Sequence, residues 1–463
     1  MAYSWTETAP GIWRRELGGL EKTYRFMSQI FKHTGHEHWG LYAICTVDFS
    51  ANQHDIATTL RHAWQALRIE FPGLAVTVDG YKAEYRIATK ESLAIWTEQT
   101  FVVDPDKQAD EIIADYPLNA LPQLYYLPAK SEVLLLTSHW RVDAIGCCLL
   151  LDRLLALASE QTESRVPAAA DSDRTHLPSP PMEDAAGAPL TPTAEINAMT
   201  QEVTTRFAQK ARSSIGIPYA GNTTTPPGQP AYESAVFTSE STAALVEACR
   251  DRKISVSAAV YAALGAAIFR MRGAGNDAAE DYSTIMAVNM RPHLQPPYDT
   301  PQHACQAYVS SITPTVRRAE NFTTNTEDLT RYFRTWHTSD YNKSLREIYR
   351  RASQGLINTG SRPPAGGPPP HGITLSSLGV IDNFFSRRVG EGKCCVRSFR
   401  FGVCMMTRQM LLYVWTFGGQ LQLSVDYNSA YYSSETPKEL LKCVKEVLEA
   451  ELAVTLTLTT AEM

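Results

Sequence analysis

Residues 132–158, EVLLLTSHWRVDAIGCCLLLDRLLALA, connect an almost continuous apolar run to a second apolar block through a short polar turn. The first run is typical of a strand buried on both faces, and Leu149 to Ala158 has the spacing of a helix. His139 and Asp143 stand four residues apart where the predicted strand ends and the helix begins. Because open α/β sheets bind ligands at such strand ends, this stretch predicts both the fold class and a functional site.

The residue types in this turn allow two interpretations. A histidine there can act as a general base near neutral pH, and a nearby carboxylate can hold structure if it is paired with a cation. In the other interpretation His139 is a core histidine bonded to backbone and Asp143 caps the helix. The H-x-x-x-D spacing alone does not decide between them, because it arises by chance in many proteins.

Composition limits the class of protein. A chain of 463 residues with 44% hydrophobic and 20% charged residues suggests a globular protein with two or three cores. The 43 basic and 49 acidic residues give a net charge of -6, which argues against a surface that binds nucleic acid or anionic lipid. No secretory signal pattern and no 18-residue apolar run occurs. The nine cysteines include two adjacent pairs and no C-x-x-C, so we expect reduced thiols in a cytoplasmic protein without a structural zinc site.

Three segments rich in proline, glycine and small polar residues divide the chain. Residues 161–192 lack apolar periodicity and predict a linker or surface crossover, followed by a helix from Thr193 to Ser213. A second stretch covers residues 217–230, and a third, residues 357–372, predicts a surface loop that carries no core.

Strands and helices are predicted on both sides of these segments, which indicates an α/β protein. Ile56 to Phe71 has helical spacing and is stopped by Pro72, and Asp79-Gly80 predicts a hairpin turn. In the second half we expect a strand near residues 235–237, helices that open at Ser239 and near Ser255, and a final helix over residues 437–453. Further strands are expected within residues 283–290, 306–316, 372–380, 404–417 and 420–428, the last two joined by a turn at 417–420.

Six blocks in this order resemble a known superfamily: LRHAWQALRIEFPGL (60–74), LLLTSHWRVDAIG (134–146), SVSAAVYAALGAAI (255–268), AVNMRPHL (287–294), LSSLGVIDNF (375–384) and TFGGQLQLSVDYN (416–428). The superfamily contains chloramphenicol acetyltransferase, the plant BAHD acyltransferases and peptide-synthetase condensation domains, and the chain looks most like fungal trichothecene-type O-acetyltransferases. It departs at Ser138, where many members have a second histidine, and at Ala144, where glycine is usual. The plant D-F-G-W-G motif is absent, and only Phe401-Gly402 stands in a comparable place.

The resemblance implies two chloramphenicol acetyltransferase-like α/β domains related by a pseudo-twofold axis, with mixed sheets, flanking helices and an active-site tunnel between them. Residues 1–160 would form the N-terminal domain with the H-x-x-x-D motif, residues 161–234 a crossover linker with one helix, and residues 235–463 the C-terminal domain. His139 would lie midway along the tunnel, and Arg141 would be at the surface or in the tunnel wall.

The implied reaction is acyl transfer, most simply of acetyl, from coenzyme A to a hydroxyl of a fungal secondary metabolite. His139 would take the proton of the acceptor hydroxyl, with no covalent acyl-enzyme, and Asp143 would pair with Arg291 in an architectural role. Hydroxyl groups that could contact the oxyanion or the donor are those of Ser376, Ser377 and Thr407. A basic cluster that could meet the phosphates of coenzyme A consists of Arg387, Arg388 and Lys393.

The expected partners are therefore acyl-CoA as co-substrate and a small-molecule acceptor, with no bound cofactor, no metal, no nucleic acid and no membrane, and we expect a monomer. His33, His36 and His38 match no common ligand spacing, and residues 273–276, GAGN, lack the context of a dinucleotide site. Three alternatives remain open: a donor carried by a carrier protein, cyclisation or isomerisation of a reactive intermediate on the same scaffold, and a non-catalytic binding protein.

Overall fold

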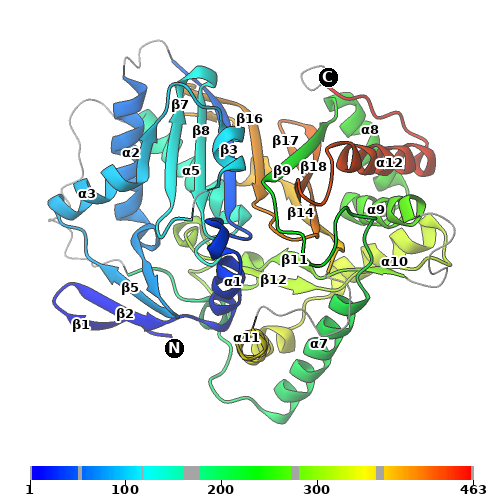
Figure 1. The fold of residues 1–463 in the computed structure, drawn as a ribbon, viewed down its shortest axis with the longest axis horizontal. Helices are drawn as coiled ribbons and strands as arrows, with labels where there is room; N and C mark the ends of the chain where they lie inside the picture. The colour runs from blue at the N-terminus through cyan, green and yellow to red at the C-terminus, as the bar shows by residue number, and fades with distance from the viewer. Residues whose placement is uncertain are drawn as a thin grey trace.

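The computed structural model describes residues 3–50, 55–116, 118–160, 177–272, 281–360 and 370–459. Two large sheets dominate it, one on the left and one on the right of Figure 1. The first has the strand order β15-β16-β3-β8-β7-β6. Its strands are β15 (Arg388–Val389), β16 (Cys394–Val403), β3 (Leu41–Phe49), β8 (Glu132–Thr137), β7 (Gln123–Leu127) and β6 (Phe101–Val103). The second sheet has the order β14-β17-β18-β9, formed by β14 (Ile373–Val380), β17 (Met410–Phe417), β18 (Gln420–Asn428) and β9 (Pro230–Val236).

Helices cover each sheet with their apolar faces. On the first sheet these are α2 (Ile56–Glu70), α3 (Lys90–Thr100), α4 (Ala109–Ala114) and α5 (Ala144–Glu160). On the second they are α8 (Ser239–Asp251), α9 (Val256–Arg272) and α12 (Glu435–Leu452), and α10 (Phe322–Thr335) packs on α9. In α2, the side chain of Asp55 caps the helix by accepting from the Thr58 backbone N–H at 2.9 Å, and Leu60, Trp64 and Leu67 are buried at the predicted spacing.

A third layer of helices lies below the two sheets in Figure 1. It contains α1 (Gly19–Gln29), α6 (Met182–Ala185), α7 (Ala194–Ser213) and α11 (Ser339–Thr359), with α1 packed on α11. Short antiparallel pairs complete the structure. One pair is β11 (Met286–Asn289) with β12 (Val309–Ile312), and another is β10 (Tyr282–Ser283) with β13 (Thr315–Val316). A four-stranded ribbon consists of β1 (Thr6–Ala9), β2 (Ile12–Glu16), β5 (Lys82–Arg86) and β4 (Thr77–Asp79).

The α/β class with mixed sheets and flanking helices is confirmed. The predicted turn at Asp79-Gly80 joins β4 to β5, and Gly80 has a φ of 56°, which glycine adopts without strain. The turn between β17 and β18 likewise places Gly418 and Gly419 at positive φ.

Two expectations about the dividing segments need correction. Of residues 161–192, residues 161–176 lie outside the described residues, but Met182, Glu183 and Asp184 are buried in α6 against α1 and α11 rather than at the surface. Of the loop predicted over 357–372, residues 357–359 end α11, and 361–369 lie outside the described residues.

The strand β16 crosses between the two halves of the chain. It is the orange strand beside β3 in Figure 1 and pairs antiparallel with it from Cys394↔Phe49 to Val403↔Leu41. The first sheet is therefore completed by residues far beyond position 235, and the division of the chain into domains stays a prediction.

In the part of the chain that the structure describes, no single helix has the length and apolar character to cross a membrane; only α8 and α9 together, bent by 98°, meet those criteria. All nine cysteines are free thiols, and eight are buried.

Candidate active site

His139 lies in the turn between β8 and α5. Its imidazole is stacked on the ring of Tyr24 from α1, with ring centroids 3.9 Å apart and an interplanar angle of 11°. The Nδ1 atom is buried and makes no hydrogen bond to a side chain of the described residues. Burial lowers the pKa of His139, and it outweighs the backbone groups of His139 and Val142 and the charge of Asp143, which raise that pKa. The imidazole is therefore neutral at neutral pH, as a general base must be.

Asp143 fixes the start of α5 and ties it to the segment that carries Arg291. Its Oδ1 accepts from the Gly146 backbone N–H at 2.8 Å, and its two oxygens both accept from Nη1 of Arg291 at 2.8 Å. Oδ2 also accepts from the Tyr308 backbone N–H at 2.7 Å. Asp143 and Arg291 are each 5% exposed, so this is a buried ion pair and a helix cap at once.

The second terminal nitrogen of Arg291 donates hydrogen bonds to the backbone. Its Nη2 donates to the carbonyl oxygens of Ala304 at 3.4 Å and Gln306 at 3.2 Å. The structure therefore brings Asp143 and Arg291 together beside His139, and their carboxylate and guanidinium groups bind each other and the backbone.

Ser138 is paired with a buried carboxyl group. Its hydroxyl donates to Oε2 of Glu37 at 2.9 Å, while Oε1 of Glu37 has no hydrogen-bond partner among the described residues. Both residues line a small cavity together with Tyr116 and Thr137. Burial raises the pKa of Glu37 to about 7, against the hydrogen bond from Ser138 and the positive charges of Arg25 and Arg141. A titratable carboxyl is thus hydrogen-bonded to Ser138, the residue that precedes His139 in the chain.

Arg141 is not at the surface. It is 3% exposed, and its Nη1 and Nη2 donate to the carbonyl oxygens of Gly73 at 2.6 Å and Ala120 at 3.0 Å. Its guanidinium also lies over the ring of Trp140, 4.5 Å from the centroid. Arg141 therefore ties three loops of the first half together through Nη1 and Nη2, which corrects the surface position, one of the two that the sequence analysis offered.

The three candidate hydroxyl groups have different surroundings. Ser376 lies opposite Tyr413 in the pairing of β14 with β17, and burial raises the pKa of Tyr413, with smaller contributions that include the nearby Tyr24. Ser377 points to the other face of the sheet, because successive side chains alternate, and its hydroxyl shares a 2.7 Å hydrogen bond with Ser257 on α9. Thr407 lies in the loop before β17, where its hydroxyl accepts from the Gln409 backbone N–H at 3.3 Å. Of the two serines, only Ser376 is on the face that carries Tyr413.

The basic cluster lies at the opposite end of the first sheet from His139. Arg388 in β15 pairs with Cys395, which pairs with Asp48 on β3, whereas Thr137, just before the His139 turn, pairs with Leu41. Leu41 and Asp48 are seven residue steps apart on β3, or about 23 Å along the strand. Arg387 and Arg388 are exposed, and the Nζ of Lys393 donates to the Ser159 carbonyl at 3.0 Å. The structure does not bring this cluster to His139.

Two residues at the site were not among the candidates from the sequence. Tyr24 lies on α1, and the i, i+4 spacing of Leu20 and Tyr24 was the available sign that both share a helix face. Glu37 lies in the histidine-containing segment before β3, where a lone carboxylate gave no sign of its burial.

The histidines near the start of the chain were considered as metal ligands in the sequence analysis. No group of three or more His, Cys, Asp or Glu side chains there is placed to hold a metal ion. Nδ1 of His38 accepts from the Met406 backbone N–H at 3.2 Å, and burial lowers the pKa of His38 to about 3. The segment 273–276 lies outside the described residues.

Comparison with known structures gives the class of protein that this fold and site define. The fold matches TRI3 trichothecene 15-O-acetyltransferase from Fusarium sporotrichioides with a TM-score of 0.80, at 16% identity, over 97% of each chain. It also matches the first condensation domain of the CDA synthetase with a TM-score of 0.65, at 18% identity, over 96% of this chain and 99% of that chain. Residues 226–335 match the family model of the phthiocerol/phthiodiolone dimycocerosyl transferase C-terminus. The protein has the two-lobed fold of the chloramphenicol acetyltransferase-like and condensation-domain superfamily.

Sequence relatives narrow this class to one family. The chain is 44% identical over 454 residues to O-acetyltransferase pigM of Monascus ruber, covering 98% of this chain and 88% of pigM. It is 38% identical over 452 residues to azaphilone biosynthesis cluster protein M of Aspergillus terreus, covering 96% of this chain and 98% of that protein. The chain belongs to this family of fungal O-acetyltransferases, and the resemblance drawn from its sequence is confirmed.

Proposed function

We propose that the protein transfers an acetyl group from acetyl-CoA to a hydroxyl group of a fungal secondary metabolite, with His139 as the general base. The observation that carries the proposal is the geometry at His139. His139 is partly exposed as a residue, and burial lowers the pKa of its imidazole so that the ring is neutral. It follows a strand end that the buried Asp143–Arg291 pair holds in place. The family relatives named as acetyltransferases supply the reaction type.

In this reaction the neutral imidazole accepts the proton of the acceptor hydroxyl while the hydroxyl oxygen attacks the thioester carbonyl. A tetrahedral intermediate forms, its carbon–sulfur bond breaks, and the departing thiolate takes the proton back from the imidazolium. The histidine is restored, and no acyl group is bound to the protein. Because Nδ1 of His139 is buried, Nε2 is the nitrogen assigned to proton transfer.

Ser376 is the favoured hydroxyl for the developing oxyanion. Ser376 lies on the face of the second sheet that carries Tyr413. Ser377 lies on the opposite face, where its hydroxyl is hydrogen-bonded to Ser257. Removing an oxyanion donor costs about 10²–10³-fold in kcat. Ser376→Ala should therefore reduce kcat strongly, while Ser377→Ala, its matched control on the same strand, should leave kcat unchanged and lose about 1 kcal/mol of stability with the Ser257 bond.

The acceptor class follows from the names of the relatives. One of them belongs to an azaphilone biosynthesis cluster, so the proposed acceptor is a hydroxylated polyketide of that type. The tunnel between the lobes is part of the same proposal, since it would bring donor and acceptor to His139 from opposite faces.

The test uses the purified protein, acetyl-CoA and a panel of hydroxylated azaphilone, other polyketide and terpenoid acceptors. Free thiol and product mass are followed for the wild type, His139→Ala and His33→Ala, the last replacing an exposed histidine as a control. Thiol release with an acetylated product, lost only in His139→Ala while that variant stays folded, is the expected result. A product of unchanged mass without thiol release would replace the transferase with a cyclase or isomerase. Full activity in His139→Ala would remove the assigned base.

A further inference from the structure

The imidazole of a general base must be held in one orientation, and in this structure the neighbouring carboxylate is not free to hold it. The oxygens of Asp143 already accept hydrogen bonds from the Gly146 backbone, the Arg291 side chain and the Tyr308 backbone. Nδ1 of His139 is buried without a hydrogen-bond partner among the described residues. The orientation of the ring must therefore come from packing and from the local backbone.

The packing partner is Tyr24. Its ring lies parallel to the imidazole, 3.9 Å away, and Trp39 meets the Tyr24 ring edge-on at 6.0 Å. A parallel contact of this kind prevents the imidazole from turning about its χ2 bond, because rotation would drive the ring edge into the Tyr24 face. Burial raises the pKa of Tyr24, so its ring remains the neutral phenol through neutral pH.

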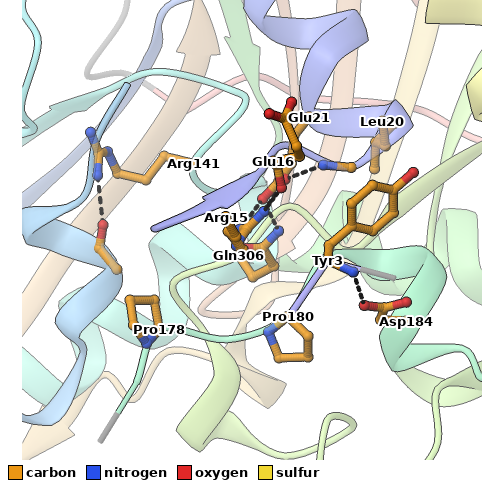
Figure 2. A network of polar contacts seen from close by, with 12 residues as sticks. Tyr3, Arg15, Glu16, Leu20, Glu21, Arg141, Pro178, Pro180, Asp184 and Gln306 are labelled. Carbon is orange, nitrogen blue, oxygen red and sulfur yellow. Dashed lines mark hydrogen bonds and ion pairs between the residues drawn. The ribbon is translucent and has the colours of Figure 1, made fainter. Parts of the chain in front are cut away.

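The helix that carries Tyr24 is itself anchored by buried charges. Figure 2 shows Arg15, Glu21 and Gln306 grouped at the start of α1. Both terminal nitrogens of Arg15 donate to the Glu21 carboxylate at 2.7 Å, and Nε2 of Gln306 donates to it at 2.7 Å. One turn before Tyr24, the Leu20 backbone N–H donates to Glu183 at 2.9 Å. A bidentate buried pair with further hydrogen bonds leaves α1 little freedom to shift.

Gln306 links this anchor to the other side of His139. Its side chain binds Glu21 of α1, and its backbone carbonyl accepts from Arg291, the partner of Asp143. The segment from Ala304 to Tyr308 thus holds both the helix that presents Tyr24 and the turn that presents His139.

From this geometry we infer that Tyr24 is a positioning residue for His139: its aromatic ring, rather than its hydroxyl, sets the plane of the imidazole so that Nε2 meets the acceptor hydroxyl. The inference rests on the proposed function in assigning proton transfer to His139. Misplacement of a reacting group by about 1 Å can cost 10²-fold in rate, so loss of the ring should affect the chemical step more than binding.

The experiment compares Tyr24→Leu with Tyr24→Phe, which removes the hydroxyl and keeps the ring. Tyr298→Leu is the matched control, because Tyr298 contacts His303 edge-on at 4.9 Å in another part of the chain. Each protein is prepared with isotope-labelled histidine rings, and the His139 signal is identified by its loss in His139→Ala. Steady-state kinetics with acetyl-CoA and the acceptor are measured on the same samples.

We expect the ring current of residue 24 to shift the His139 ring-proton signal upfield in the wild type and in Tyr24→Phe. In Tyr24→Leu this upfield shift should be lost. In Tyr24→Leu, kcat should fall by about 10–100-fold with an unchanged KM for acetyl-CoA, while Tyr24→Phe and Tyr298→Leu keep the wild-type kcat.

Three results would overturn the inference. An unmoved His139 signal in Tyr24→Leu would show that the stack does not hold the ring, and a wild-type kcat in that variant would show that the stack is not needed. An equal loss in Tyr24→Phe would assign the effect to the hydroxyl. If the wild type transfers no acetyl group, the proposed function fails, and the histidine signals still decide whether Tyr24 positions His139.

Discussion

Replacing Asp143 with alanine should destabilise the protein by about 3–5 kcal/mol, more than the loss of an ordinary side chain. The substitution leaves the guanidinium of Arg291 buried at 5% exposure without its counter-charge, which is the largest cost. It also removes the cap of α5, a loss of about 0.5–2 kcal/mol, and leaves the Tyr308 backbone N–H without its acceptor, a loss of about 1–3 kcal/mol. These three costs arise at one site and are not additive. The expected loss of unfolding free energy is therefore about 3–5 kcal/mol, the cost of breaking a buried ion pair.

The assay is urea unfolding followed by far-UV circular dichroism and tryptophan fluorescence, because agreement of the two probes tests whether unfolding is two-state. Arg291→Met should cost a similar amount, since it leaves Asp143 buried without a partner charge. The double variant removes both charges. Its loss of unfolding free energy should be smaller than the summed losses of the two single variants by about 2–3 kcal/mol.

The matched control is Asp328→Ala. Asp328 also binds an arginine, but its side chain is 31% exposed and that of Arg317 is 54% exposed, so the change should stay within about 1 kcal/mol. If Asp143→Ala is no more destabilised than Asp328→Ala, or if the double variant equals the sum of the singles, the buried pair does not hold the turn as reasoned here.

Three further outcomes follow from the site. Because burial lowers the pKa of His139, log kcat/KM should be flat above pH 7 and fall only below about pH 6.5; a profile still rising at about pH 8 would contradict this. Burial raises the pKa of Glu37 to about 7, so the folded protein keeps a proton that the unfolded chain releases near pH 4.3. The protonated Glu37 therefore contributes stability that is lost as pH rises from about 4.3 to about 7, by up to about 1.4 kcal/mol per pH unit. Glu37→Gln should therefore gain stability relative to the wild type in urea titrations as pH rises from about 5 to 8, and a constant difference would refute the assignment. Gly146→Ala would place a methyl group onto the Ala304 carbonyl oxygen and 3.1 Å from Nη2 of Arg291, so the urea midpoint should drop by the equivalent of about 1–3 kcal/mol, whereas an unchanged midpoint would show that the turn has room.

The turn around His139 could be predicted from sequence because its determinants are local. The apolar strand, the polar turn and the apolar helix follow one another within 132–158, and each has its own periodicity. The hairpin turns at Asp79-Gly80 and Gly418-Gly419 were predictable for the same reason, since glycine at positive φ is a local requirement. The pairing of Asp143 with Arg291 spans 148 residues and came only from the resemblance of the Asn-x-Arg-Pro block.

What the sequence did not indicate depends on contacts between distant segments. The helices α10 and α11 consist largely of polar residues, and their burial at Leu329, Leu345 and Ile348 becomes visible only in the packed structure. Period-two alternation could place Ser376 and Ser377 on opposite faces, but it could not tell which face meets α9. Tyr24 reaches His139 because α1 is docked by Glu21 and Glu183, and no local pattern records that docking.

The order in which the chain is synthesised gives the strand β16 a further consequence. On a ribosome β3 emerges early, but its partner β16 is made only after 345 further residues, counted from Phe49 to Cys394. At about 5–20 residues per second, the apolar edge of β3 waits roughly 17–70 s for its neighbour. During that time its unpaired N–H and C=O groups can pair with another nascent chain, which is the usual route to aggregation. The edge of β3 is therefore a site of aggregation during synthesis. A fragment ending at residue 234 would keep that edge unpaired, because its partner strand, residues 394–403, lies in the other half.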